Sequence, residues 1–367
     1  MAPAVKAWRV RAALVALCVA LASCRGTGPW PIWQKLTLPL RGDAVHFAVI
    51  GDSGTGGRQQ YEVAQRMAEF HERYPFDFVL MLGDNMYGGE EPEDFDEKFT
   101  RPYQALLARG VTFYAALGNH DLAAQELPFE PFHMGGKRYY TFTKGPAQFF
   151  ALDSNYMDPE QLDWLARALE KSVAPWKICF FHHPIYSSGR RHGSEVDLRL
   201  LVEPLFVRAG VNVVFAGHEH LYERMKPQQG IHYFTSGGAG KLSRNDFASG
   251  RPAADALRAA GYDQDRHFML IEIAGDTLYF QAISRTGRTV DSGTIYRAEA
   301  EPAEPAPQAS RRTGASGAER LLGADALLLA EVGERPVVLE DGGDALHDLC
   351  VAHDDAHLAA GVELGLP

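Results

Sequence analysis

Five short polar segments constrain the fold of this chain most strongly, because each follows directly after an apolar run of strand length. Four of the five open with glycine, which lets the backbone bend sharply and come close to a bound ion. In an open α/β sheet the carboxyl ends of parallel strands meet at one edge, so we expect these polar side chains to converge there. The segments are Gly51-Asp52-Ser53-Gly54, Gly83-Asp84-Asn85-Met86-Tyr87, Gly118-Asn119-His120-Asp121, His182-His183-Pro184 and Gly217-His218-Glu219-His220.

The pattern around the first two segments predicts a β-α-β unit. The apolar run 46–50 is followed by a helical pattern over 59–74 and by a second apolar run, 78–82. A crossover of this kind makes the two strands parallel neighbours. Apolar runs and amphipathic segments continue to alternate along the chain, so the sequence predicts an α/β fold.

Later elements show the same alternation. Asp158 stands before Pro159, a pair that is typical of a helix start. The strands predicted after the β-α-β unit are 111–117, 148–152, 177–181, 211–216, 232–235, 267–273 and 277–282. We expect the last three to be antiparallel, with Gly275-Asp276 as the hairpin turn between the final two.

The first 24 residues predict an export leader. A basic start is followed by an apolar run, 12–22, that is too short for a comfortable membrane span. The run ends in Leu21-Ala22-Ser23-Cys24, which resembles a bacterial lipobox with a lipidated Cys24. We therefore expect an exported lipoprotein, anchored by its lipid to the periplasmic or extracellular face of a membrane. A cleaved signal peptide with an incidental cysteine is the alternative.

The rest of the chain divides into three parts. Residues 25–43 are predicted to be a linker or an arm lying on the domain, 44–297 the catalytic domain, and 298–367 a disordered tail. The formal net charge is −11, and from Glu299 onward the tail holds fourteen acidic and four basic residues. The body is therefore nearly neutral and has no basic stripe, so we expect no nucleic-acid partner.

The donor types in the five segments are those of a two-metal site. Two cations about 3.5–4 Å apart need a carboxylate to bridge them, with oxygen and imidazole ligands around the rim. A single Gly-Asp pair after a strand is weak evidence for a metal site, because such a pair more often forms a turn. All five segments in this order are strong evidence for a two-metal site.

This order of motifs resembles the calcineurin-like metallophosphoesterase family. Tyr87, three residues after Asp84, makes the chain similar to the small, tartrate-resistant type of purple acid phosphatase. The resemblance spans about 44–296 and implies a four-layer α/β/β/α sandwich with mixed sheets. It also implies a hydrolase that cleaves small phosphate monoesters at a binuclear metal centre, where a metal-activated hydroxide attacks phosphorus.

The resemblance assigns ligands by motif. It implies a first ion, Fe3+, held by Asp52, Asp84, Tyr87 and His220. It implies a second ion, Fe2+, Zn2+ or Mn2+, held by Asp84, Asn119, His182 and His218, so that Asp84 bridges the pair. A free phenol has a pKa near 10, so Tyr87 would bind as phenolate only to a strongly Lewis-acidic ion such as ferric iron. An aromatic ring that merely packs beside the site is the alternative for Tyr87.

The resemblance also gives catalytic roles to three residues. His120 would contact the substrate and protonate the leaving group, with Asp121 orienting its ring. His192 resembles a second substrate histidine, although a plain surface histidine is an alternative, and Arg190 or Arg191 could clamp the phosphate instead.

Several polar residues are expected to have ordinary roles. His183 is predicted to pack or hydrogen-bond beside His182, Asp153 to cap a turn, and Cys179 to be a small buried residue. The glycine-rich segment 235–240 is predicted to be a backbone turn beside the site.

Two other functions remain open. One is a manganese or zinc phosphodiesterase or nucleotidase of the same fold, in which Tyr87 is not a ligand. The other is a lipoprotein that uses the fold only for binding.

Overall fold

The computed structural model describes residues 35–247 and 252–297, and all of these belong to one compact unit. The predicted leader with Cys24, most of the predicted linker and the tail from residue 298 lie outside the described residues. No helix in the described part combines the length and apolar character that a membrane span requires.

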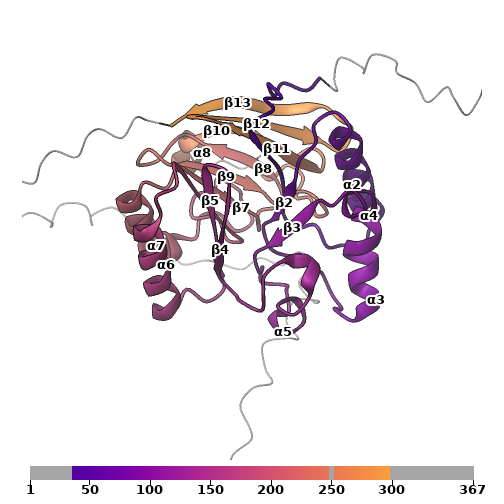
Figure 1. The fold of residues 1–367 in the computed structure, drawn as a ribbon, viewed down its shortest axis with the longest axis horizontal. Helices are drawn as coiled ribbons and strands as arrows, with labels where there is room; N and C mark the ends of the chain where they lie inside the picture. Colours follow the sequence, from indigo (N-terminus) through magenta and orange to yellow (C-terminus); the bar gives the residue numbers. More distant parts are fainter. Residues whose placement is uncertain (1–34, 248–251, 298–367) are drawn as a thin grey trace, which may run out of the picture. The chain divides into compact units, whose positions relative to one another are not determined.

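Two mixed sheets form the centre of the molecule (Figure 1). The first has six strands in the order β13-β12-β11-β1-β2-β3, with β1, β2 and β3 parallel and the others antiparallel. Its strands are β1 (Val45–Ile50), β2 (Phe78–Met81), β3 (Thr112–Ala115), β11 (His267–Ala274), β12 (Thr277–Ser284) and β13 (Thr289–Tyr296).

The second sheet has seven strands in the order β10-β8-β9-β7-β6-β5-β4. Its middle strands β5, β6, β7 and β9 are parallel, while β4 pairs antiparallel with β5, β8 with β9, and β10 with β8. The strands are β4 (Tyr140–Lys144), β5 (Ala147–Ala151), β6 (Trp176–Phe181), β7 (Val213–Ala216), β8 (Tyr222–Met225), β9 (His232–Ser236) and β10 (Arg258–Tyr262).

Helices cover the outer face of each sheet. In Figure 1, α2 and α4 lie on one side of the paired sheets, and α6 and α7 lie on the other. This confirms the predicted four-layer α/β/β/α sandwich with mixed sheets. The helices are α2 (Arg58–His71), α3 (Pro92–Phe95), the π-helical turn η2 (Asp96–Thr100), α4 (Arg101–Leu107), α5 (Ala123–Glu126), the 3-10 turn η3 (Glu130–Phe132), α6 (Pro159–Lys171), α7 (Val196–Ala209) and α8 (Pro252–Leu257).

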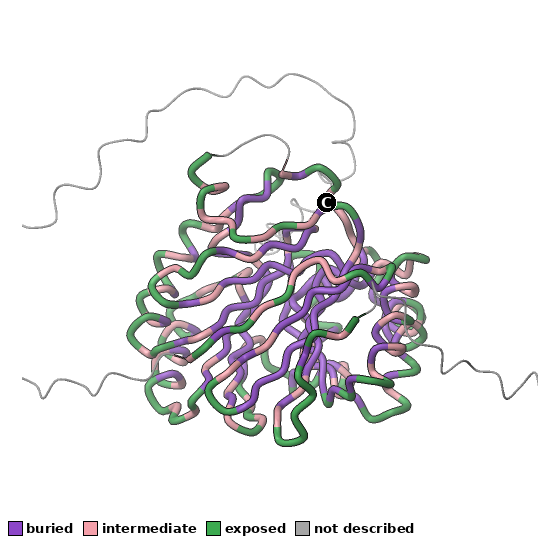
Figure 2. The backbone as a smooth tube through the Cα atoms, turned by 90° about the horizontal axis from the view of Figure 1, so that it is seen from above, coloured by how far each residue is buried: buried purple, intermediate pink, exposed green. Residues whose placement is uncertain are grey.

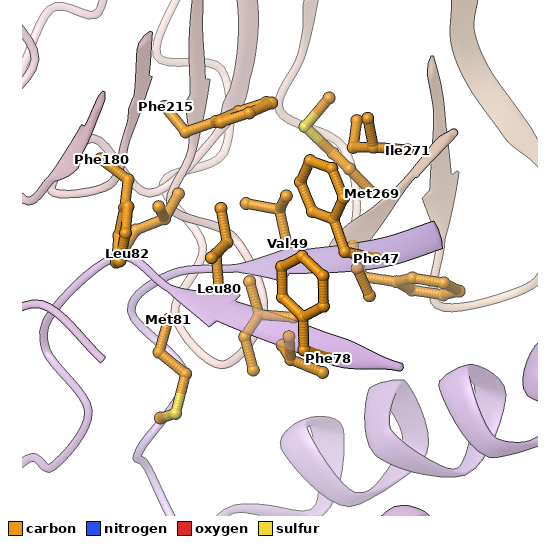
Figure 3. Close-up of a cluster of buried hydrophobic side chains, with 14 of the residues drawn as sticks. Phe47, Val49, Phe78, Leu80, Met81, Leu82, Phe180, Phe215, Met269 and Ile271 are labelled. Carbon is orange, nitrogen blue, oxygen red and sulfur yellow. The ribbon is translucent and has the colours of Figure 1, made fainter. Parts of the chain in front are cut away.

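The two sheets pack face to face through apolar side chains (Figure 3). Phe47 of β1 stacks on Phe78 of β2 with ring centroids 5.1 Å apart. Its edge also meets Phe149 of β5 at 5.3 Å and Phe215 of β7 at 6.3 Å, so one ring joins both sheets. Figure 2 shows the result: buried strands run through the middle, and exposed residues gather in the outer helices and loops.

The local predictions are largely confirmed. β1 and β2 are parallel neighbours, and Ala274 pairs with Thr277 across the Gly275-Asp276 turn. The side chain of Asp158 caps α6 by accepting a hydrogen bond from the backbone N–H of Gln161. Cys179 is a buried free thiol in β6, and burial raises its pKa.

The prediction of an antiparallel strand at residues 232–235 is confirmed only in part. They form β9, which pairs antiparallel with β8 but parallel with β7 in the second sheet, whereas β11 and β12 lie in the first sheet. An apolar run indicates a strand, but it carries no information about which neighbour the strand pairs with. The short or half-exposed strands β4, β8, β10 and β13 were not predicted from the sequence.

The described end of the predicted arm lies on the domain. Leu38 is buried against the core, and Glu272 of β11 accepts hydrogen bonds from the backbone N–H groups of Leu40 at 2.8 Å and Arg41 at 2.9 Å. Glu272 is itself fully buried. Gln281 of β12, also buried, accepts from Thr37 N–H at 2.8 Å, so two buried side chains hold the arm. Glu272 itself pairs with His46, at the end of β1 away from Gly51.

Phe47→Ala should lower the free energy of unfolding by about 3–5 kcal/mol, because it removes the ring that joins the two sheets and leaves a cavity. Denaturant unfolding would measure the change. Val173→Ala is the control, since Val173 is 97% exposed, and it should change stability by less than about 0.5 kcal/mol. A loss of under about 1 kcal/mol for Phe47→Ala would contradict the proposed role of this ring.

Candidate metal centre

The five polar segments follow five strands that belong to two different sheets. Asp52, Asp84 and Asn119 follow β1, β2 and β3 of the first sheet, whereas His182 and His218 follow β6 and β7 of the second. The expectation of a single sheet edge is therefore wrong in this respect. The side chains do converge, but they do so where the carboxyl ends of both parallel sets face each other.

The backbone at this junction is strained and crowded. Asp52, Asp84 and His218 have φ values of 54°, 50° and 67°, in the left-handed region that non-glycine residues seldom adopt. Gly118 lies directly against this backbone, and a Cβ atom there would sit 2.2 Å from the amide nitrogen of Asp84. Glycine is therefore required at position 118 because the two loops approach too closely for a side chain.

A first group of donors surrounds the Tyr87 phenol. Tyr87 Oη donates to Asp52 Oδ1 at 3.1 Å and lies 3.3 Å from His220 Nε2. His220 Nε2 is in turn 3.4 Å from Asp52 Oδ1. Donor atoms of Asp52, Asp84 and His220 all lie within 4.8 Å of one another. The structure thus brings together the four residues predicted for the first ion.

A second group of donors surrounds His182. Its Nε2 lies 3.0 Å from Asn119 Oδ1, 3.1 Å from His218 Nδ1 and 3.4 Å from Asp84 Oδ1. These are the four residues predicted for the second ion. Asp84 belongs to both groups, which is the position that a bridging carboxylate needs.

The chemistry of the second group fits a cation. His182 Nδ1 is 2.9 Å from the carbonyl oxygen of Leu82, which can only accept, so Nδ1 carries the proton and Nε2 presents a lone pair. The oxygens of Asn119 and Asp84 that face Nε2 are acceptors as well. Lone pairs that converge without a hydrogen between them repel one another unless a positive ion lies among them. The donor set, imidazole with amide and carboxylate oxygen, suits a transition metal.

Burial sets the protonation states of these groups. Burial lowers the pKa of His182 and His218, and it lowers the pKa of His220 to about 4, so all three are neutral and able to ligate at neutral pH. Burial, followed by the Asp84 charge, raises the pKa of Asp52. Burial together with Asp52 and Asp84 raises the pKa of Tyr87 as well. A buried site that disfavours its own anions in this way gains most from a bound cation.

His120 lies on the solvent-exposed side of the two donor groups. Its side chain is exposed, its ring centroid is 4.9 Å from that of Tyr87, and its backbone N–H donates to Asp84 Oδ1 at 3.0 Å. It can therefore reach a molecule bound at the centre. Its substrate role stays a prediction.

Asp121 has partners other than the one predicted. Its Oδ1 accepts from the backbone N–H of Met86 at 3.0 Å, and its Oδ2 accepts from Gly118 N–H at 2.7 Å and Asn85 Nδ2 at 3.1 Å. The carboxylate thus braces the loops after β2 and β3. That Asp121 also orients the His120 ring stays a prediction.

The predicted second histidine lies beside the second group. The ring centroid of His192 is 4.1 Å from that of His218, and the His192 side chain is exposed. The neighbouring Arg190 and Arg191 are also exposed. The backbone N–H of Arg190 donates to Asp246 at 2.8 Å. A role for either arginine as a phosphate clamp stays a prediction.

Two residues near the centre were not assigned to it from the sequence. His183 shares a group with His182 and His218, and its Nδ1 is 2.8 Å from Ser154 Oγ, so it hydrogen-bonds as expected but also faces the ligands. Lys241 places Nζ 4.2 Å from the centroid of the Tyr87 ring. The sequence offered one signal, the adjacency of His183 to His182, and none for Lys241.

The expectations for Asp153 and for the glycine-rich segment are confirmed. Asp153 Oδ2 accepts from Arg138 Nε at 2.7 Å, and its Oδ1 accepts from Asn155 N–H at 3.0 Å, so it holds a turn. In the segment 235–240, Gly240 N–H donates to the carbonyl oxygen of Asp52 at 3.1 Å. This segment is a backbone turn that supports the centre from behind.

A cavity of about 600 Å³ opens beside the second group, at Asn119 and His183. Its wall includes Leu122, Arg138 and Tyr156. A substrate held at the two donor groups therefore has room for its leaving group on this side.

Comparison with known proteins agrees with this geometry. The calcineurin-like phosphoesterase family model matches residues 45–222. Purple acid phosphatase 3 of Arabidopsis thaliana is 31% identical over 248 residues, which cover 57% of this chain and 67% of the relative. Purple acid phosphatase 17 of the same plant is 27% identical over 252 residues, which cover 58% and 74%.

Solved structures share the fold. A purple acid phosphatase from yellow lupin (Lupinus luteus) seeds aligns with a TM-score of 0.58 at 17% identity, covering 70% of this chain and 54% of that one. GAP50, the anchor in the inner membrane complex of Plasmodium, aligns with a TM-score of 0.57 at 18% identity, covering 70% and 90%. These structures share the fold, and the family model and the sequence relatives carry the conclusion: the chain belongs to the calcineurin-like phosphoesterase family and is a metal-dependent phosphoesterase related to the purple acid phosphatases.

Proposed function

We propose that this protein hydrolyses small phosphate monoesters at a mixed-metal centre, with Fe3+ in the first donor group and Fe2+, Zn2+ or Mn2+ in the second. One observation carries the proposal: Tyr87 Oη lies 3.1 Å from Asp52 Oδ1 and 3.3 Å from His220 Nε2, inside the first group. A phenol whose pKa is raised by burial loses its proton only to a strongly Lewis-acidic ion. Ferric iron meets that requirement.

The two ions, when bound, would supply an activated water and neutralise charge on the phosphoryl oxygens. The chain's own part is to place and orient these groups. Asp84 would share its carboxylate between the two ions, and His182 would keep its tautomer through Leu82. His120, exposed at the open side, would hand its proton to the leaving oxygen.

The manganese or zinc phosphodiesterase or nucleotidase remains the alternative function, and Tyr87 separates the two. In that alternative the phenol is a hydrogen-bond donor to Asp52 and ligates nothing. Both functions require the residues of the second donor group as metal ligands.

Asp84→Asn should abolish bound metal and phosphatase activity together, because both groups share that carboxylate. Elemental analysis and hydrolysis of an aryl phosphate would measure the two effects. Asp153→Asn is the matched control, since Asp153 also ends a strand but is paired with Arg138, and it should retain the metal. Two bound ions in folded Asp84→Asn protein would contradict the bridging role.

Iron-replete wild-type protein should show a visible phenolate-to-iron charge-transfer band, and Tyr87→Phe should lose the band while it keeps the fold. The phenylalanine ring fills the same space but has no oxygen to bind iron. Visible spectroscopy together with iron content measures this directly. A colourless wild-type protein that contains iron and is active would favour the alternative function.

His120→Ala should slow turnover of an alkyl phosphate by roughly 10²–10⁴-fold, the usual range for losing a general acid. Bound metal should not change, because the two donor groups are complete without this side chain. Steady-state kinetics and elemental analysis test both statements. If metal is lost instead, His120 is a ligand and its proposed role is wrong.

A further inference from the structure

The loop between β6 and α7 carries His192 to a place beside the centre. Ser187 to Gly193 follow the ligand His182 closely, and the exposed His192 ring comes within 4.1 Å of the His218 ring, centroid to centroid. Within the loop, Ser187 N–H donates to Ser194 Oγ at 2.9 Å, and Gly189 N–H donates to Ser187 Oγ at 3.0 Å. The backbone N–H groups of His192 and Gly193 instead bond to a residue outside the loop.

Glu219 lies beneath it. This residue is fully buried, and its Oε1 accepts hydrogen bonds from the backbone N–H groups of His192, at 2.8 Å, and of Gly193. The loop also rests directly on the carboxylate at Gly189, where a Cβ atom would lie 2.5 Å from Glu219 Cδ. Glu219 thus accepts hydrogen bonds at the His192–Gly193 end of the segment 189–193 and packs against its Gly189 end, while Arg190 N–H between them donates to Asp246 at 2.8 Å.

A second buried carboxylate accepts hydrogen bonds from the beginning of the same loop. Glu223 of β8 accepts from Ser187 Oγ at 2.8 Å and from the backbone N–H of Ser188 at 3.0 Å. Both carboxylates come from one short stretch of chain after β7. That stretch begins with the turn that bears the two histidines of the centre, His218 and His220.

We infer that Glu219 is a positioning residue, which holds the loop so that the His192 side chain faces the substrate beside His218. The inference rests on the proposed function, because it takes His192 to contact the phosphate ester. His218 and His220 point to the two donor groups, and Glu219 between them points to the loop. The turn 217–220 therefore fixes the position of His192 relative to the metal ligands His218 and His220.

A double-mutant cycle tests the inference in metal-loaded protein. Glu219→Ala should lower kcat/KM roughly 100-fold in the wild-type background, the size of effect that a small misplacement of a catalytic group has. In a His192→Ala background the same change should cost less than about threefold, since the group that it positions is gone. Equal losses in both backgrounds, or loss of bound metal in Glu219→Ala, would overturn the inference.

Two further variants separate positioning from general damage. Glu219→Gln keeps an acceptor oxygen for His192 and Gly193, and it should retain activity within about fivefold of wild type. Glu272→Ala removes another fully buried carboxylate that holds two consecutive backbone N–H groups, far from the centre. It should lower thermal stability and leave kcat/KM unchanged.

Hydrogen exchange gives a readout that does not need activity. In metal-free protein, the amides of His192 and Gly193 should exchange at least about tenfold faster in Glu219→Ala than in wild type. Unchanged exchange would overturn the inference. Wild-type protein that binds two ions yet hydrolyses no phosphate ester would instead overturn the proposed function, and the exchange result would still test the anchoring of the loop.

Discussion

The site depends on one electrostatic constraint, the convergence of lone pairs around Asp84 and His182. Leu82 fixes the proton of His182 on Nδ1, so Nε2 faces the oxygens of Asn119 and Asp84 with no hydrogen between them. A cation among these atoms removes the repulsion between them. Because Asp84 also reaches the first group, with Asp52 and His220, the two cation positions are linked through a single carboxylate.

The backbone that holds these donors together adopts conformations that non-glycine residues seldom adopt, and packing within the sandwich stabilises them. Asp52, Asp84 and His218 are left-handed, and glycines make room where the loops meet. Strain of this kind persists only when the surrounding structure over-determines it. Here the support comes from both sheets, which Phe47 and Phe215 pack together behind the site. Buried carboxylates complete it, with Asp121 bracing the loops after β2 and β3 and Glu219 holding the loop of His192.

Much of the fold and the site could be predicted from the sequence, for local reasons. Strand runs that end in a polar turn identified Asp52, Asp84, Asn119, His182 and His218 as donors, and the structure brings all five together. The local pattern carries no information about contacts between distant segments. The parallel pairing of β9 with β7 and the hydrogen bond from Met86 N–H to Asp121 could therefore not be predicted from the sequence.

The sequence by itself determined which chemistry is available: the donor types, their order, and the alternation of strands and helices that brings them to loop positions. Only the tertiary structure decided that the donors come from two sheets, that His183 and Lys241 also reach the centre, and that Glu219 supports the His192 loop. The physical reason is that side-chain type and periodicity are properties of neighbouring residues. Contact across two packed sheets depends instead on how the whole chain buries its apolar surface.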